Sequence, residues 1–302
     1  MEIFLPVAGS SINIVVLVGL GALAGFMSGL LGVGGGFLLT PLLIMMGIDP
    51  LVAAASDTNA IVGASASGTM AHLRARSVDV KMGALLLAGG ILGGGAGTFL
   101  VKALRTGGNA GVVIVLGYVA LLAVMGVILF VAGVTSQVKG EEDARSESPG
   151  YRLLQRLPLS TDFPASGVRT SAIAPIILGI LVGVLAALLG VGGGFFLIPA
   201  MSYFLAMPMR VAIGTSLFQM LFTSASVTVM QASVNHTVDA FLALGLLLGG
   251  TLGAQAGARA ARALKGNQLK VVLALLLLAL SVKMFDDLLV LPRHFLTTPG
   301  GH

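Results

Sequence analysis

Cysteine is absent from the 302-residue chain, so disulfides, thiolate catalysis and cysteine metal ligands are excluded. Tryptophan is also absent, which leaves Tyr and Phe as the aromatic anchors for a membrane interface. Charged residues make up only 10% of the chain, whereas a soluble domain carries about 25%. Because 56% of the residues are hydrophobic and the mean hydropathy is +1.02, the polar surface cannot cover a globule in water. The chain is therefore predicted to be an integral membrane protein.

The apolar segments predict an all-α fold. Several are long enough to cross a bilayer, which takes about 20 residues, and none alternates apolar with polar residues as the strands of a membrane barrel do. Glycine is abundant, with 43 residues, as expected where membrane helices pack closely. The eight predicted spans are 12–31, 51–73, 82–104, 110–134, 172–190, 210–231, 239–258 and 269–291.

The chain contains an internal repeat. The sequence LLGVGGGFLLTP at 30–41 returns as LLGVGGGFFLIP at 188–199, an offset of 158, and the dipeptide VD at 78–79 returns at 238–239. These matches divide the chain into a first transmembrane repeat at 12–134, a linker at 135–170 and a second transmembrane repeat at 172–291. The linker is charged and rich in Ser and Pro, so it is predicted to be a flexible, solvated and cytoplasmic connection.

The basic residues predict that the second repeat is inverted. Arg74, Arg76 and Lys81 lie between two spans of the first repeat, whereas the corresponding loop near 232–238 has no Lys or Arg. Because positive charge prefers the cytoplasmic side, these two loops are expected on opposite sides of the membrane. The predicted architecture is two inverted repeats of about five helical segments each, with eight full spans and two short segments.

The glycine motif predicts a broken helix in each repeat. Consecutive glycines cost about 1 kcal/mol each relative to Ala in a helix, so each span should stop and a short half-helix should follow. The free N-terminus of such a half-helix attracts anions, and inverted repeats would bring both to one central point. The candidate substrate-binding glycines are Gly34, Gly35, Gly36, Gly192, Gly193 and Gly194. The alternative is that these glycines only allow close helix packing.

Polar residues follow each half-helix within otherwise apolar spans. Such residues are costly in a membrane and usually face the bundle interior, although a Ser or Thr hydroxyl can bond back to its own helix. Asp57 could carry a proton, cap its helix or bind a cation, and His72 is the second candidate for coupling to protons. The remaining candidate substrate-binding residues are Thr58, Asn59, Thr215, Ser216 and Gln219.

The doubled motif and these polar segments resemble the TauE/SafE family of sulfite and organosulfonate exporters. The resemblance rests on GLLGVGGGFLLTPLL, ALLGVGGGFFLIPAM, and the polar stretches that begin at AAASDTNA and VAIGTSLFQ. It implies a multi-pass carrier of the inner (cytoplasmic) membrane that exports small anionic sulfur compounds, with the proton gradient as the energy source. The second repeat keeps the family's TS pair at 215–216, whereas the first reads SDT at 56–58.

Several expectations about partners and chemistry accompany this reading. The expected partners are a small anionic substrate and the lipid bilayer, with a homodimer as an open alternative. No nucleic acid, cofactor, metal or enzymatic activity is expected, since no metal-ligand spacing and no nucleophile–base pair is present. The competing classes are a channel or cation carrier that uses Asp57 as a ligand, and a membrane scaffold without transport. A nucleotide-driven pump is disfavoured because no Walker A motif is present.

Overall fold

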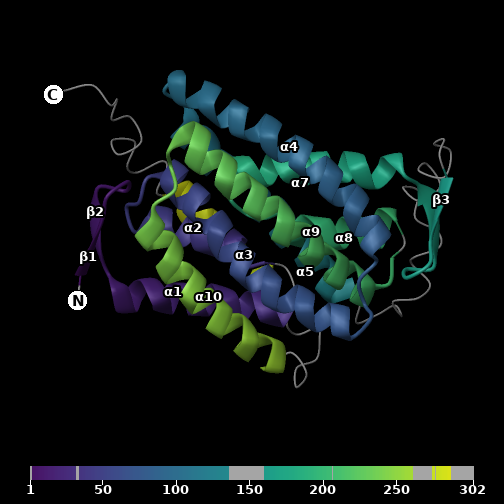
Figure 1. Cartoon of the computed structure of the whole chain (residues 1–302). Coiled ribbons are helices and arrows are strands. Elements are labelled where there is room, and N and C mark those ends of the chain that lie inside the picture. Colours follow the sequence, from purple (N-terminus) through teal and green to yellow (C-terminus); the bar gives the residue numbers. More distant parts are fainter. Residues whose placement is uncertain are drawn as a thin grey trace.

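The computed structural model describes residues 2–31, 34–135, 160–205, 207–260, 274–275 and 277–286, and these are mostly helical (Figure 1). The helices are α1 (Ile14–Leu31), α2 (Gly36–Met45), α3 (Pro50–Arg74), α4 (Val80–Thr106), α5 (Ala110–Thr135), α7 (Ile173–Leu189), α8 (Gly194–Phe204), α9 (Met209–Met230) and α10 (Ala240–Ala260). A π-helical turn, η1 (Gln231–Asn235), follows α9, and residues 277–286 are also helical. The strands are β1 (Glu2–Leu5), β2 (Ser10–Asn13), β3 (Ser160–Phe163) and β4 (Val168–Ser171).

Four of the described helical segments are long and apolar enough to cross a membrane. They are Val80–Thr106, Ala110–Ile128, Met209–Asn235 and Ala240–Gly257. α1 and α7 are shorter because the glycine motifs end them, and α3 is long but carries a polar run from Ser56 to Asn59. The prediction of a helical, multi-pass membrane protein is confirmed, whereas the count of eight spans stays a prediction.

A β-hairpin precedes the first helix of each repeat. Glu2 pairs with Asn13 in the first hairpin and Ser160 pairs with Ser171 in the second, so the two registers are related by the same offset of 158. Both turns carry the pattern Pro-x-x-Gly, at 6–9 and at 164–167. Figure 1 shows β1–β2 and β3 at opposite ends of the molecule. The repeated unit therefore includes the hairpin, which the sequence analysis missed.

The second hairpin corrects part of the linker prediction. Residues 160–170 were predicted to belong to a flexible, solvated connection, but they form the paired strands β3 and β4. The reason is that this stretch repeats the N-terminal hairpin and has a place to dock. Residues 136–159 of the predicted linker lie outside the described residues.

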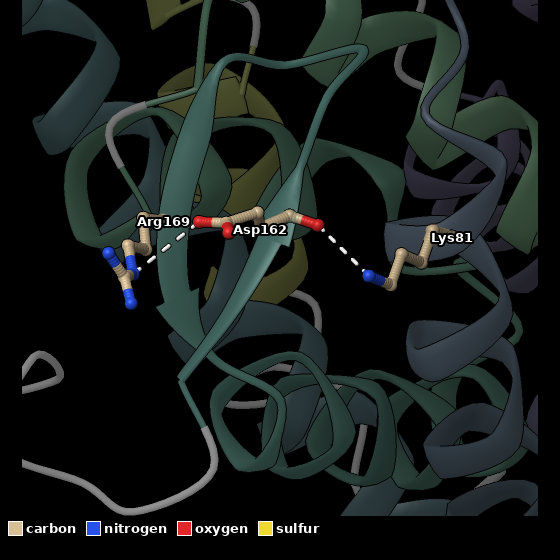
Figure 2. A network of polar contacts seen from close by, with 3 residues as sticks. All are labelled: Lys81, Asp162 and Arg169. Atoms are coloured by element: carbon tan, nitrogen blue, oxygen red, sulfur yellow. Dashed lines mark hydrogen bonds and ion pairs between the residues drawn. The ribbon is translucent and has the colours of Figure 1, made fainter.

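Surface charges contribute little to the docking of this hairpin. Asp162 and Arg169 face each other across the two strands at 3.4 Å, and Lys81 Nζ of α4 donates to the Asp162 carbonyl at 3.0 Å (Figure 2). The side chains of the ion pair are 78% and 73% exposed, and exposed pairs of this kind typically contribute about 0–1 kcal/mol. The main attachment is a buried one.

Two buried aspartates attach the hairpins to the helices of the opposite repeat. Asp79 Oδ1 caps α4 at the Met82 N–H (3.0 Å), and its Oδ2 accepts from the N–H (3.1 Å) and hydroxyl (2.8 Å) of Ser166. Asp239 Oδ1 caps α10, and its Oδ2 accepts from the N–H groups of Val7 (2.9 Å) and Ala8 (3.4 Å). Each aspartate thus joins the start of a helix in one repeat to the hairpin turn of the other.

We expect Asp239→Ala to loosen the first hairpin selectively. Losing a helix cap and the acceptor of two part-buried N–H groups costs roughly 1–2 kcal/mol, so amide exchange at residues 7–9 should accelerate about tenfold. Hydrogen exchange followed by mass spectrometry measures this, with the second hairpin as the internal control. Asp79→Ala should give the mirror result at residues 165–167. Equal acceleration in both hairpins of either variant would contradict these attachments.

Two glycine seams join the repeats. α1 packs on α10 and α4 packs on α7, each time a helix of one repeat against a helix of the other. A Cβ built on Gly25 would lie 2.1 Å from the Gly250 carbonyl oxygen, and one on Gly183 would lie 2.3 Å from that of Gly90. Gly25 corresponds to Gly183, and Gly250 to Gly90, so the same contact occurs twice with the repeats exchanged. Figure 1 shows α4 and α7 side by side.

The equivalent helices α3 and α9 meet at the centre and run antiparallel. The Thr228 hydroxyl donates to that of Thr58 at 3.1 Å, near the start of α3 and the end of α9. Near the end of α3, a Cβ on Gly68 would lie 2.9 Å from Leu217, in the first half of α9. The first turns of these two helices therefore lie at opposite ends of their contact.

Candidate functional site

The first glycine motif breaks the chain into α1 and the half-helix α2. α1 ends at Leu31 and α2 begins at Gly36, and Gly34 has a φ of +76°, a conformation that favours glycine. The N-cap of α2 is Gly35, so no side chain caps the helix. Gly35 packs on the carbonyl of Ala24, which places the start of α2 well inside the length of α1. The predicted helix, turn and half-helix are confirmed.

The second motif breaks the chain in the same way. α7 ends at Leu189, Gly190, Gly192 and Gly193 all have positive φ, and α8 begins at Gly194. Its N-cap, Gly193, also provides no side-chain cap. Both half-helices therefore begin without a capping side chain, and such ends attract negative charge.

The two glycine turns lie against each other. A Cβ built on Gly36 would lie 2.7 Å from the Gly190 carbonyl oxygen, a distance that only glycine permits. Two apolar side chains from the central helices fill the remaining space. Met220 of α9 contacts both Gly34 and Gly192, and Ile61 of α3 contacts Gly192 as well as Gly36. The turns converge as the repeat predicted, but an apolar contact closes the point between them.

Asp57 and Thr40 form a buried polar pair beside the first turn. The Thr40 hydroxyl donates to Asp57 Oδ2 at 2.7 Å, and both residues are fully buried. Asp57 Oδ1 has no hydrogen-bond partner among the described residues. The Tyr118 hydroxyl of α5 interacts with Thr40 and donates to the carbonyl of Leu189, the last residue of α7. This network links α2, α3 and α5 of the first repeat to the broken helix of the second.

The structure separates the polar residues that the sequence placed together. Thr58 faces Thr228, which lies twelve residues beyond Ser216 on α9. Twelve helical residues span about 18 Å, so Thr58 and Ser216 lie far apart along the α3–α9 pair. These two predicted site residues therefore do not meet in the structure. Because α3 and α9 run antiparallel, polar groups in the first half of each helix lie toward opposite ends of their contact.

Most of the predicted hydroxyls are engaged in local bonds. Thr58 and Ser216 donate to their own helices, at the carbonyls of Ala55 (2.6 Å) and Ile213 (2.8 Å). Thr215 accepts a hydrogen bond from the backbone N–H of Asp79 at 2.9 Å, which fixes the start of α4. These three residues have a structural role in the described conformation.

Asn59 and His72 lie away from the glycine turns. Asn59 is only half-buried and shares a face of α3 with the exposed Ala66, since seven residues make two helical turns. His72 lies fifteen residues beyond Asp57, about 22 Å along the helix axis. Its Nδ1 contacts the Ser77 hydroxyl at 2.8 Å, next to Gly214 at the start of α9. His72 is thus placed at an end of the central helix pair.

Gln219 retains an unused polar atom. Its Nε2 donates to the Thr223 hydroxyl at 2.8 Å, and its Oε1 has no partner in the part of the chain that the structure describes. Ser65, Thr69 and Ser224, on the same two central helices, also carry buried hydroxyls without a described partner. Buried polar atoms are rarely left unpaired, so α3 and α9 can offer polar atoms to a bound solute.

Sequence reasoning missed Thr40 and Tyr118. Both had a signal: Thr40 is the polar residue of the first half-helix where the second repeat has Ile198, and Tyr118 is one of only three tyrosines in the chain. Among the described residues, no group of three or more His, Cys, Asp or Glu side chains could hold a metal ion.

These features define a multi-pass helical membrane protein whose repeats meet at paired broken helices, a design typical of membrane transporters. Residues 17–284 match the family model described as "Sulfite exporter TauE/SafE". The chain belongs to this family and is a membrane transporter protein.

Curated relatives carry consistent names. The chain is 24% identical over 294 residues to "Probable membrane transporter protein YunE" of Bacillus subtilis (strain 168), covering 91% of this chain and 98% of the relative. It is 28% identical over 247 residues to a "Probable membrane transporter protein" of Xylella fastidiosa (strain 9a5c), covering 81% and 84%. It is 26% identical to YjnA of Bacillus subtilis, covering 91% and 99%. No solved structure gives a significant match.

Proposed function

We propose that the protein is a secondary transporter that exports a small anionic sulfur compound, sulfite or an organosulfonate, across the inner (cytoplasmic) membrane, driven by the proton gradient. The observation that carries this proposal is the meeting, at one buried point, of the two glycine turns that precede the uncapped half-helices α2 and α8. Helix N-termini supply N–H donors and partial positive charge. A membrane interior offers an anion little else. The family description supports the sulfur compounds as the substrate class.

The apolar contact between the turns fits a carrier better than an open channel. Met220 and Ile61 fill the space where a solute would pass, so this conformation is closed. Transport then requires the central helices to shift and expose one side at a time. A channel or carrier for another small solute is the alternative.

The inverted arrangement with eight crossings is part of the proposal. The antiparallel packing of α3 and α9 and the exchanged seam contacts support inversion, because repeats related by an axis along the membrane normal would keep equivalent helices parallel. We expect cysteines introduced singly at Arg76 and Ser233 to be labelled from opposite sides of the membrane. The chain has no native cysteine to interfere. Labelling of both from one side by an impermeant reagent would refute the inversion.

A flux panel tests the function. We expect proteoliposomes to move sulfite or a sulfonate, and to move it faster when a pH gradient is imposed. Sulfite, sulfate, thiosulfate, sulfoacetate and taurine should be compared with and without the gradient, with empty liposomes as the control. Flux that follows cation identity instead of anion identity would favour a cation carrier. Absence of flux for every compound would contradict the proposal.

A further inference from the structure

We propose that Asp57 is a tethered anion that occupies the start of α2 and competes with the transported anion, so the two glycine turns have unequal roles. The inference rests on the proposed function and adds a regulatory residue to that site. It predicts that the carboxylate weakens binding of the substrate while it is charged, and that proton uptake relieves this competition.

The carboxylate lies at the uncapped end of the half-helix. Gly36 is the first residue of α2, and a Cβ built on it would lie 3.1 Å from Asp57 Oδ2. One turn further along, the Thr40 hydroxyl donates to the same oxygen at 2.7 Å. Negative charge is favoured at a helix N-terminus. Asp57 therefore places negative charge beside the first turn of α2, the region to which a free anion would also be attracted.

The second carboxylate oxygen is left unsatisfied. Asp57 is 0% exposed, and its Oδ1 has no partner among the described residues. A buried charged oxygen without a partner is costly. A proton on this carboxylate removes the charge, and with it the repulsion that a nearby anion would experience. The charged carboxylate, which is the form that competes with the substrate, is therefore destabilised mainly at this unpaired oxygen.

The second half-helix has no such competitor. At the offset of 158, Asp57 corresponds to Thr215 and Thr40 corresponds to Ile198. The Thr215 hydroxyl is engaged by the backbone N–H of Asp79. The contacts of Gly192 and Gly193 near the start of α8 are the apolar side chains of Ile61, Met220 and Val182. The two half-helices begin at equivalent residues, Gly36 and Gly194, but only the first has a carboxylate beside its start.

Few other ionisable groups share this environment. α2 and α7 contain no ionisable side chain. Tyr118, from α5, interacts with Asp57 and donates its hydroxyl proton to the Leu189 carbonyl. The backbone N–H of Asp239, before α10, meets Ser56, but its carboxylate is held by the hairpin and by α10. On α9, Arg210 lies at the far end, near His72. Asp57 is therefore the carboxylate whose charge a bound anion would meet first.

The size of the effect follows from Coulomb's law. Two like charges about 6 Å apart, at an effective dielectric constant of about 20, reduce affinity on the order of a hundredfold. We therefore expect Asp57→Thr, which gives the first repeat the residue of the second, to lower the KM for the transported anion about tenfold at pH 8 and much less at pH 6, where proton uptake relieves the competition. The isosteric Asp57→Asn should do the same. Both variants should also lose the part of the pH dependence of KM that the parent shows beyond the substrate's own titration.

The second repeat provides matched variants, because Thr215 is the position equivalent to Asp57. Thr215→Asp should raise KM at least tenfold, because it places a second carboxylate at the position of the second repeat that is equivalent to Asp57. The double variant Asp57→Thr with Thr215→Asp should return KM toward the parent value. Asp162→Asn, an exposed acid on β3, is the control and should leave KM unchanged.

The measurement is uptake of labelled sulfite, with ethanesulfonate as a fully ionised sulfonate, into proteoliposomes at pH 6 and pH 8. Substrate titration is common to all variants and cancels in the ratio of variant to parent. Size-exclusion profiles and thermal unfolding show that each variant is folded. Unchanged KM and pH dependence in both Asp57 variants would overturn the inference, as would a raised KM in Asp57→Asn. If the parent moves neither anion, the proposed function itself fails, which is a separate result.

Discussion

Gly25→Leu should prevent the chain from assembling into a stable protein. The Cβ of any residue at this position would lie 2.1 Å from the backbone oxygen of Gly250, and a backbone atom cannot rotate out of the way. Overpacking in a well-packed core typically costs 1–3 kcal/mol and occasionally more. Here the helix α1 must move away from α10, so the contacts along the whole seam are lost. We expect little or no monodisperse protein after detergent extraction.

Two further substitutions complete this test, one at the equivalent glycine of the second repeat and one at an exposed glycine of α1. Gly183→Leu should have the same effect at the α4–α7 seam, because its Cβ would meet the Gly90 carbonyl at 2.3 Å. Gly19→Leu, on the exposed side of α1, is the control, since nothing lies within 4 Å of a Cβ there. Fluorescence-detected size exclusion measures all three. Normal yield and stability of Gly25→Leu would mean that the seam is not required for assembly.

Gln219→Leu should abolish most transport while the protein stays folded. Leucine has a similar size but cannot supply the Oε1 acceptor that is buried without a partner, nor the Nε2 donor now bound to Thr223. A site that hydrogen-bonds its solute loses several kcal/mol when such a group is removed, and losses of two or more orders of magnitude are known. We expect initial uptake to fall at least tenfold.

An exposed glutamine serves as the control for this variant. Gln255→Leu, on the exposed face of α10, makes the same chemical change away from the central helices and should transport like the parent. Thermal unfolding shows whether the Gln219 variant retains its packing. Parent-like uptake by a folded Gln219→Leu protein would remove Gln219 from the site.

The sequence was sufficient to predict the elements that depend on backbone propensity. Two glycine clusters within apolar helices predicted a break, a half-helix and a meeting point, and the positive φ values at Gly34 and Gly192 show why glycine is needed there. The internal repeat predicted equivalent elements. Both features are local or periodic, so a single chain carries enough information to find them.

Other elements depend on tertiary contacts that no local pattern shows. Each hairpin strand has only four residues, which is too short for a strand pattern to be recognised in the sequence. The turn residues Pro6 and Gly9 do recur as Pro164 and Gly167 at the offset of 158. Thr215 was expected at the substrate, but its partner is an N–H group 136 residues away in the sequence. The separation of Thr58 from Ser216 follows from the direction in which α3 and α9 pass each other, which spacing along the chain cannot give.

The exchanged seams have a consequence for how such a chain is assembled. α1 has its glycine face covered by a helix of the second repeat, and α7 has its own covered by a helix of the first. Neither half can bury these faces by itself, so in packing terms the molecule is an obligate dimer whose subunits are joined by a peptide link. A half-length polypeptide of this kind would need a second copy whose central helix runs the opposite way. Joining both copies in one polypeptide makes pairing independent of concentration and allows each half to acquire its own side chains, as at Asp57 and Thr215.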